Sequence, residues 1–107
     1  MGKIMKLYKY TFKIISDYDK NFASTKLVLL KYPIIKETPY GHWIKYWNKQ
    51  NKKWVPKTGG NLFAYTTEAW ALDNFIQRKR RQIGLIKFNL KRIEEAKKLA
   101  EDLIKQL

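Results

Sequence analysis

The hydrophobic residues of this chain change their spacing near residue 66, and that change constrains the fold more than any other feature. Before it, apolar and polar residues alternate in short runs separated by glycine, proline and polar residues, which is typical of β-strands. After it, apolar residues recur every three or four positions and no proline follows to residue 107, which is typical of a helix. The pattern therefore predicts a sheet followed by a helix.

The first part of the chain contains the expected strands. Residues 5–15 alternate between apolar side chains and Lys or Thr, and residues 26–35 are apolar on both faces for part of their length. A polar, turn-like segment at 16–24 separates them. Residues 42–47 and 52–55 are short and aromatic, and we expect them to form a β-hairpin.

The sequence leaves two structural features of the sheet open, one at Pro33 and one at residues 62–65. Pro33 has no amide hydrogen to donate, so its strand is bulged there or lies at an edge. Residues 62–65, which follow the turn sequence PKTGGN, can add a short fifth strand. We therefore expect a single α+β domain over 1–107, with an antiparallel sheet of four or five strands in 1–65 and helical structure in 66–107.

The helix is expected to begin after Thr66 or Thr67, either of which can cap it, and to continue towards residue 107. Two heptad series of apolar residues, interrupted by Lys79 and Lys97, continue across Gly84. This register favours one long C-terminal helix, with or without a kink at Gly84, and a break near Gly84 is the alternative. The first series is Ala69, Ile76, Ile83, Leu90 and Ile104, and the second is Leu72, Ile86, Ile93, Ala100 and Leu107.

The length of this helix predicts self-association. A helix of about 40 residues would be roughly 60 Å long, whereas a strand of about six residues reaches only about 20 Å. Because a sheet of that size cannot cover the whole apolar stripe, the helix either folds back at Gly84 or pairs with another molecule, for example in a homodimer. The expected oligomer seam contains Ile83, Ile86, Leu90 and Ile93.

The chain is strongly basic, with 23 Lys and Arg against 9 Asp and Glu and a formal net charge of +14. Such an excess repels itself unless an anionic partner neutralises it, and phosphate backbones are the commonest such partner. An acidic protein surface, an anionic membrane or a host with generally lysine-rich proteins would also account for the charge. Residues 1–66 hold 13 Lys and 3 acidic residues, so the part of the chain expected to form the sheet carries most of the net positive charge.

Features of export and membrane insertion are not expected. Lys6, Lys9 and Lys13 interrupt the apolar residues near the N-terminus, so a signal peptide is not predicted. No uncharged apolar run approaches the roughly 20 residues that a membrane span needs. The sequence has no cysteine, which suits a reducing compartment. We expect a cytoplasmic protein without a membrane partner.

The predicted hairpin combines aromatic and cationic side chains. Aromatic faces can stack on unpaired bases while nearby lysines contact phosphates, which together suit a surface for single-stranded nucleic acid. The alternative is that two or three of these aromatics fill the core while the lysines point to water. The candidate interface residues are Trp43, Lys45, Trp47, Lys49, Lys52, Lys53, Trp54 and Lys57.

A second basic feature lies within the expected helix, at Arg78, Lys79, Arg80 and Arg81. Consecutive residues spread around a helix axis, so only part of this block can face one partner. A phosphate contact and a contact to an acidic protein both fit it, and a solvated helix face is the alternative.

Catalysis is not expected. His42 is the only histidine, so the chain cannot form a histidine cluster for zinc, and we interpret this residue as lying on the hairpin surface. No nucleophile elbow, phosphate-binding loop or dinucleotide fingerprint occurs in the sequence. We therefore predict a binding protein that is not an enzyme and needs no metal or cofactor.

The run from Phe63 to Ala96, FAYTTEAWALDNFIQRKRRQIGLIKFNLKRIEEA, resembles the C-terminal part of small uncharacterised phage and mobile-element proteins. That group includes anti-defence inhibitors such as anti-CRISPR proteins, which are often short binders of a host nucleoprotein complex. Four antiparallel strands followed by a helix are also similar to single-stranded-DNA binders of the Whirly and coactivator type, which dimerise through the helix.

Three functions are consistent with these features of the sequence. The leading hypothesis is a module that binds nucleic acid or a nucleoprotein complex through the Lys/aromatic hairpin and the basic helix segment. The alternative, implied by the resemblance, is a phage-encoded inhibitor that docks on a host defence protein. A third is an assembly protein whose helix mediates oligomers.

Overall fold

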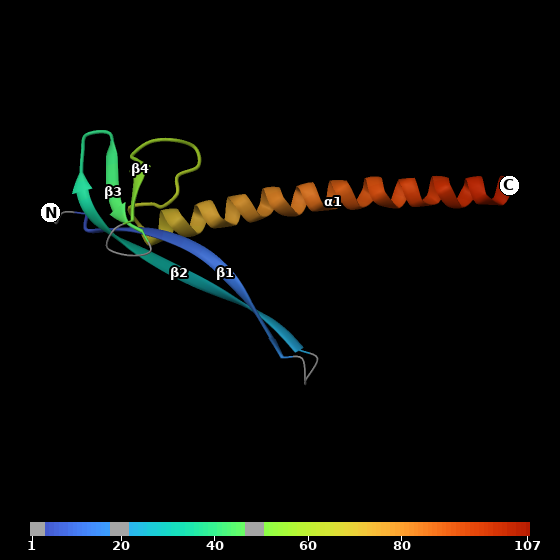
Figure 1. Ribbon diagram of the computed structural model, residues 1–107, viewed down its shortest axis with the longest axis horizontal. Helices are drawn as coiled ribbons and strands as arrows, with labels where there is room; N and C mark the ends of the chain where they lie inside the picture. The colour runs from blue at the N-terminus through green and yellow to red at the C-terminus, as the bar shows by residue number, and fades with distance from the viewer. Residues whose placement is uncertain (1–3, 18–21, 47–50) are drawn as a thin grey trace. The chain divides into compact units, whose positions relative to one another are not determined.

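Four antiparallel strands precede a long helix in the computed structural model of the chain, which describes residues 4–17, 22–46 and 51–107 (Figure 1). The elements are β1 (Lys6–Asp17), β2 (Phe22–Glu37), β3 (Gly41–Lys45), β4 (Lys52–Pro56) and α1 (Glu68–Gln106). The strands are neighbours in the order β1-β2-β3-β4. The predicted α+β arrangement of an antiparallel sheet and a C-terminal helix is confirmed.

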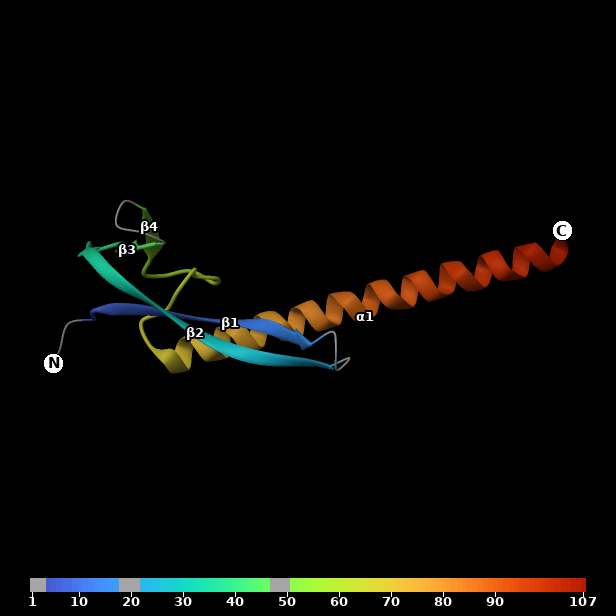
Figure 2. The ribbon, with the colours of Figure 1, turned by 60° about the horizontal axis from the view of Figure 1, so that its bottom comes forward.

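The longest part of the sheet is the ribbon that β1 and β2 form. Its register runs from the pair Lys6–Pro33 to the pair Asp17–Phe22, and Figure 2 shows its twist. The turn predicted at 16–24 is too long, because both strands extend into it and only 18–21 lie outside the described residues. The polar residues Ser16, Asp17 and Ser24 are paired in the ladder, so strand pairing overrides their turn propensity.

The strand β2 changes partner beside Pro33. It pairs with β1 up to Pro33 and with β3 from Ile34, and the second ladder has a register shift between Ile34 and Lys36. Proline has no amide hydrogen to donate, and the β2–β3 ladder begins at the residue that follows it. Of the two alternatives for the Pro33 strand, the edge position is wrong because β2 lies between β1 and β3, and the irregularity lies shortly after Pro33.

Residues 62–65 do not form a fifth strand, so the alternative of five strands is wrong. They contain one isolated bridge, in which Tyr8 and Tyr65 exchange two backbone hydrogen bonds of 2.6 and 2.8 Å. The bridge attaches the segment after β4 to β1, and the sheet keeps four strands.

A small core lies on one face of the β3–β4 hairpin. Its fully buried members are Leu7, Ile44, Val55 and Ala64, with Tyr32, Ile34 and Phe63 packed against them. Burying a large aliphatic side chain contributes roughly 1.5–3 kcal/mol, so burial of this cluster stabilises the hairpin.

Thr67 caps α1, because its Oγ1 accepts a 3.1 Å hydrogen bond from the Trp70 amide. The helix then runs unbroken through Gly84 (Figure 1), so the alternative of two helices is wrong. The chain divides into two units, residues 1–75 and residues 76–107. In the first unit Phe75 packs edge-on against Phe12 at 6.4 Å, and in the second all side chains from Arg80 onward are exposed.

Candidate nucleic-acid interface

The alternation of β3 and β4 places two tryptophans on the face of the hairpin that points away from the core. Ile44 and Val55 are buried on the inner face, whereas Trp43 and Trp54 lie directly opposite each other on the outer face. Trp43 is 38% exposed and Trp54 is 37% exposed. The alternative in which these tryptophans fill the core is therefore wrong for this pair.

The two indole rings are held in a defined arrangement. Their centroids are 5.3 Å apart and their planes are inclined by 54°. The Trp54 ring also lies over Gly41, where an added Cβ would come within 2.7 Å of its Cζ2 atom. The absence of a side chain at Gly41 thus lets Trp54 pack close to the backbone and fixes its orientation.

Lysines surround the tryptophans on the same face. Lys45 pairs with Lys52 across β3 and β4, and Lys36 of β2 pairs with Trp43. Residues directly opposite each other in an antiparallel ladder point to the same side, so these cations flank the aromatic pair. We call the set Lys36, Trp43, Lys45, Lys52 and Trp54 the tryptophan face.

The tryptophan face includes a shallow hollow. It has a volume of about 260 Å³ and is lined by Ile35, Lys36, Trp43 and Lys52. Its walls therefore combine an apolar side chain and an indole with two cations. Lys36 was not predicted from the sequence, because it lies in another strand and joins the face only through the shifted β2–β3 register.

Two predicted lysines lie elsewhere. Lys53 belongs to the inner face, where its Nζ lies 4.2 Å from the Phe63 ring centroid and 5.3 Å from that of Tyr46. Lys57 donates a 3.0 Å hydrogen bond to Oε1 of Glu37. These two lysines do not belong to the tryptophan face, and the predicted residues Trp47 and Lys49 lie outside the described residues.

The predicted basic block lies at the start of the second unit. Arg78 and Lys79 are half-buried, whereas Arg80 and Arg81 are exposed. Lys79 donates a 3.0 Å hydrogen bond to Gln82. As expected for consecutive helical residues, the four cations do not share one face.

The predicted seam residues are solvent-exposed. More than half of each side chain of Ile83, Ile86, Leu90 and Ile93 is exposed. Within the part of the chain that the structure describes, this apolar face of α1 is uncovered.

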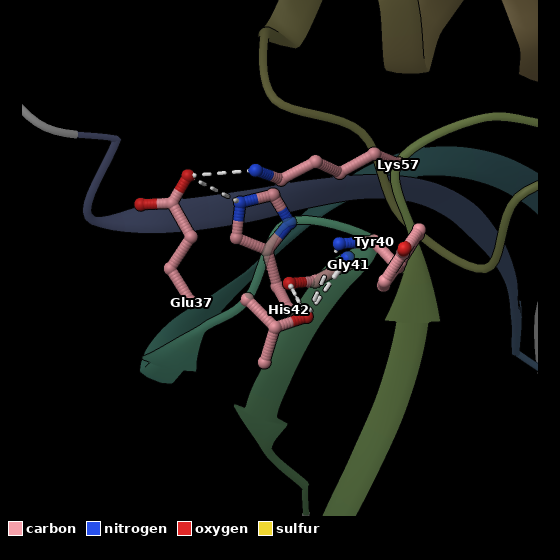
Figure 3. A network of polar contacts seen from close by, with 6 residues as sticks. Glu37, Tyr40, Gly41, His42 and Lys57 are labelled. Carbon is pink, nitrogen blue, oxygen red and sulfur yellow. Dashed lines mark hydrogen bonds and ion pairs between the residues drawn. The ribbon is translucent and has the colours of Figure 1, made fainter.

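A polar cluster beside the β2–β3 turn contains Glu37, His42 and Lys57, as Figure 3 shows. The imidazole is only 3% exposed, so the interpretation of His42 as a surface residue is wrong. Its Nε2 lies 3.8 Å from Oε1 of Glu37, which also accepts the hydrogen bond from Lys57. Leu7, Leu62 and Trp70 come from other segments of the chain and line the hollow beside the ring, so His42 faces the interior. Hairpin alternation alone did not reveal which face these segments cover.

The environment of His42 favours the neutral imidazole. Burial lowers the pKa of His42, the Glu37 carboxylate opposes that shift, and the Lys57 ammonium adds to it. A hollow of about 230 Å³ lies beside the ring, lined by Glu37, His42, Lys57 and mostly apolar residues. The hydroxyl of Thr38 accepts a 3.2 Å hydrogen bond from the Gly41 amide, so the cluster orders the β2–β3 turn.

The described residues contain no group of three or more His, Cys, Asp or Glu side chains that could hold a metal ion. Within the same ranges, no helix has both the length and the apolar character needed to cross a bilayer. Comparison of the chain with protein-family models, curated proteins and solved structures finds no match.

Proposed function

We propose that the tryptophan face binds single-stranded nucleic acid, with Trp43 and Trp54 stacking on bases and Lys36, Lys45 and Lys52 contacting phosphates. The observation that carries the proposal is the placement of two exposed indoles and three lysines on one side of β2, β3 and β4. Sheet faces that carry aromatic side chains recognise unpaired bases in this way in other proteins.

The aromatic part of the face suits stacking. Every base has a π-face, and stacking on an aromatic side chain contributes about 1–3 kcal/mol per base. Trp43 and Trp54 are already ordered by their mutual contact and by Gly41, so little conformational entropy is lost when a base stacks on them.

The cationic part suits phosphate. Lys45 and Lys52 lie directly opposite each other, and like charges in that position are destabilising. A phosphate between them would remove the repulsion. Arg78 and Arg81 of the basic block are three positions apart on α1 and form a second candidate phosphate contact.

The test is a titration of a fluorescently labelled oligonucleotide of about 12 nucleotides, with the affinity measured by anisotropy from about 50 mM to about 300 mM NaCl. Three phosphate contacts on a single strand predict a slope of about −2 in the plot of log affinity against log salt. Trp43→Ala is expected to weaken binding by about 1–3 kcal/mol.

Circular dichroism of the Trp43→Ala variant separates loss of stacking from loss of fold. An affinity that is flat across the salt range would contradict the proposal. That result, together with co-purification of a defined host protein, would favour the inhibitor function that the resemblance implies.

A further inference from the structure

The second unit, residues 76–107, exposes many large apolar side chains along one helix. Its exposed residues include Ile83, Ile86, Leu90, Ile93 and Ile104 of the two heptad series. Most helical stability in proteins comes from packing of the apolar face, and the structure provides none along this stretch. The face spans more than four heptads, which is enough for a stable coiled coil.

The charge of this unit is polarised along its length. Residues 76–91 contain six basic and no acidic side chains, whereas residues 92–107 contain four of each. Parallel pairing would place the two basic halves side by side. Antiparallel pairing would place each basic half beside a neutral one and would also oppose the two helix dipoles.

We propose that residues 76–107 pair with the same residues of a second copy of this chain in an antiparallel two-helix coiled coil. In the register that fits best, Leu90 faces Ile93 of the second copy, and Ile83 faces Ala100. Ile76 then faces Leu107, so the overlap covers the second unit from end to end and is about 48 Å long.

The two lysines in the seam select this orientation. In a parallel pair with the copies in register, Lys79 would face Lys79 and Lys97 would face Lys97 in the apolar core, and burial of like charges is unfavourable. In the antiparallel register each lysine faces an isoleucine, Ile104 and Ile86 of the second copy. Its aliphatic stem can pack there while the ammonium reaches water.

The flanking charges are also complementary. In the same register Lys87 faces Glu94 of the second copy, and Arg80 faces Glu101. In the parallel arrangement, Lys87 would instead face Gln82, and no ion pair would form. Two symmetric pairs of each kind would form per dimer.

A two-helix coil leaves a further apolar strip in solvent. Leu85, Phe88 and Leu99 lie outside the seam, and the Phe88 ring is partly covered by Arg92, whose Cζ is 5.1 Å from the ring centroid. We expect a dimer in which this strip stays in solvent, with a mass in solution of twice 12.9 kDa by light scattering. A monomer, or an assembly larger than a dimer, would overturn it.

The orientation can be tested with single cysteines because the chain has none. In the antiparallel register position 83 of one copy lies opposite position 100 of the other, within disulfide reach, while the two copies of position 83 are about 25 Å apart. Oxidation of an equimolar mixture of Ile83→Cys and Ala100→Cys is expected to give the mixed disulfide. Disulfides within each variant and none between them would overturn the antiparallel arrangement.

The register can be tested by charge exchange in the uncross-linked dimer. Lys87→Glu is expected to raise the dissociation constant of the dimer about tenfold, and Lys87→Glu with Glu94→Lys to restore it. Lys91→Glu makes the same charge change outside the seam and is the matched control, expected to have little effect. Failure of the double variant to restore the dimer would contradict this register, and helix content by circular dichroism excludes unfolding as the cause.

Discussion

Lys52 and Lys53 are neighbours in the chain but point to opposite faces of the hairpin, so they form a matched pair for testing the interface. Lys52 lies on the tryptophan face, whereas Lys53 lies over the Phe63 ring. We expect Lys52→Gln to weaken oligonucleotide binding and to reduce the salt slope by about 0.7, the contribution of one phosphate contact. Lys53→Gln should leave binding unchanged and lower the free energy of unfolding by about 0.5–1 kcal/mol.

Anisotropy titrations and urea unfolding of both variants check this prediction. Equal losses of affinity in the two variants would mean that net charge, and not the face, determines binding.

The buried imidazole of His42 should make stability depend on pH. Its pKa is lowered in the folded protein, so the unfolded chain takes up a proton first as the pH falls below about 6.5. Stability is then fully present above that pH and is lost as the pH falls towards the folded pKa, by up to about 1.4 kcal/mol per pH unit. Urea unfolding from about pH 7.5 to about pH 5.5 measures this loss.

A His42→Gln variant is the control, because glutamine does not titrate. Its stability should vary less than that of the wild type over the same range, and identical profiles would contradict the assignment. Since the chain has one histidine, its NMR titration also reports the folded pKa directly.

At the scale of the elements, Gly84 is the residue of α1 with the lowest helix propensity. It lies inside the unbroken helix, and an added Cβ would meet nothing within 4 Å. Gly84→Ala should therefore stabilise the surrounding helix by about 1 kcal/mol. Hydrogen exchange of the amides around position 84 should slow about fivefold.

Gly60 is equally open but lies outside the helix, so Gly60→Ala is the matched control and should leave exchange in α1 unchanged. Faster exchange in the Gly84→Ala variant would show that the glycine is needed by a contact of this helix.

The elements could be predicted from the sequence because their signals are local. Strand alternation, the turn residues and the heptad register each depend on residues close together in the chain. The composition of the tryptophan face could not be fully predicted, because Lys36 joins it through a bulge and a ladder between distant residues. The burial of His42 was missed for a similar reason: a hairpin pattern shows which residues share a face, but not which face another strand covers.

At the scale of the whole molecule, the formal net charge of +14 predicts that salt stabilises the free protein. Repulsion among cations opposes folding, and added ions screen it. The described ion pairs, such as Arg92–Glu95 and Lys97–Glu101, are exposed and lose little when screened. The melting temperature should rise from about 50 mM to about 300 mM NaCl, while the affinity for nucleic acid falls over the same range.

One cross-strand pair allows the electrostatic origin of this effect to be checked. Lys13 and Lys26 lie directly opposite each other on β1 and β2, away from the tryptophan face, and both are exposed. Lys26→Glu converts their repulsion into attraction, so it should stabilise the protein by about 0.2–1 kcal/mol and make the melting temperature less dependent on salt. Oligonucleotide binding should change little. A wild-type melting temperature that falls as NaCl is added would contradict the prediction, because specific ion pairs would then outweigh the general repulsion of the excess lysines and arginines.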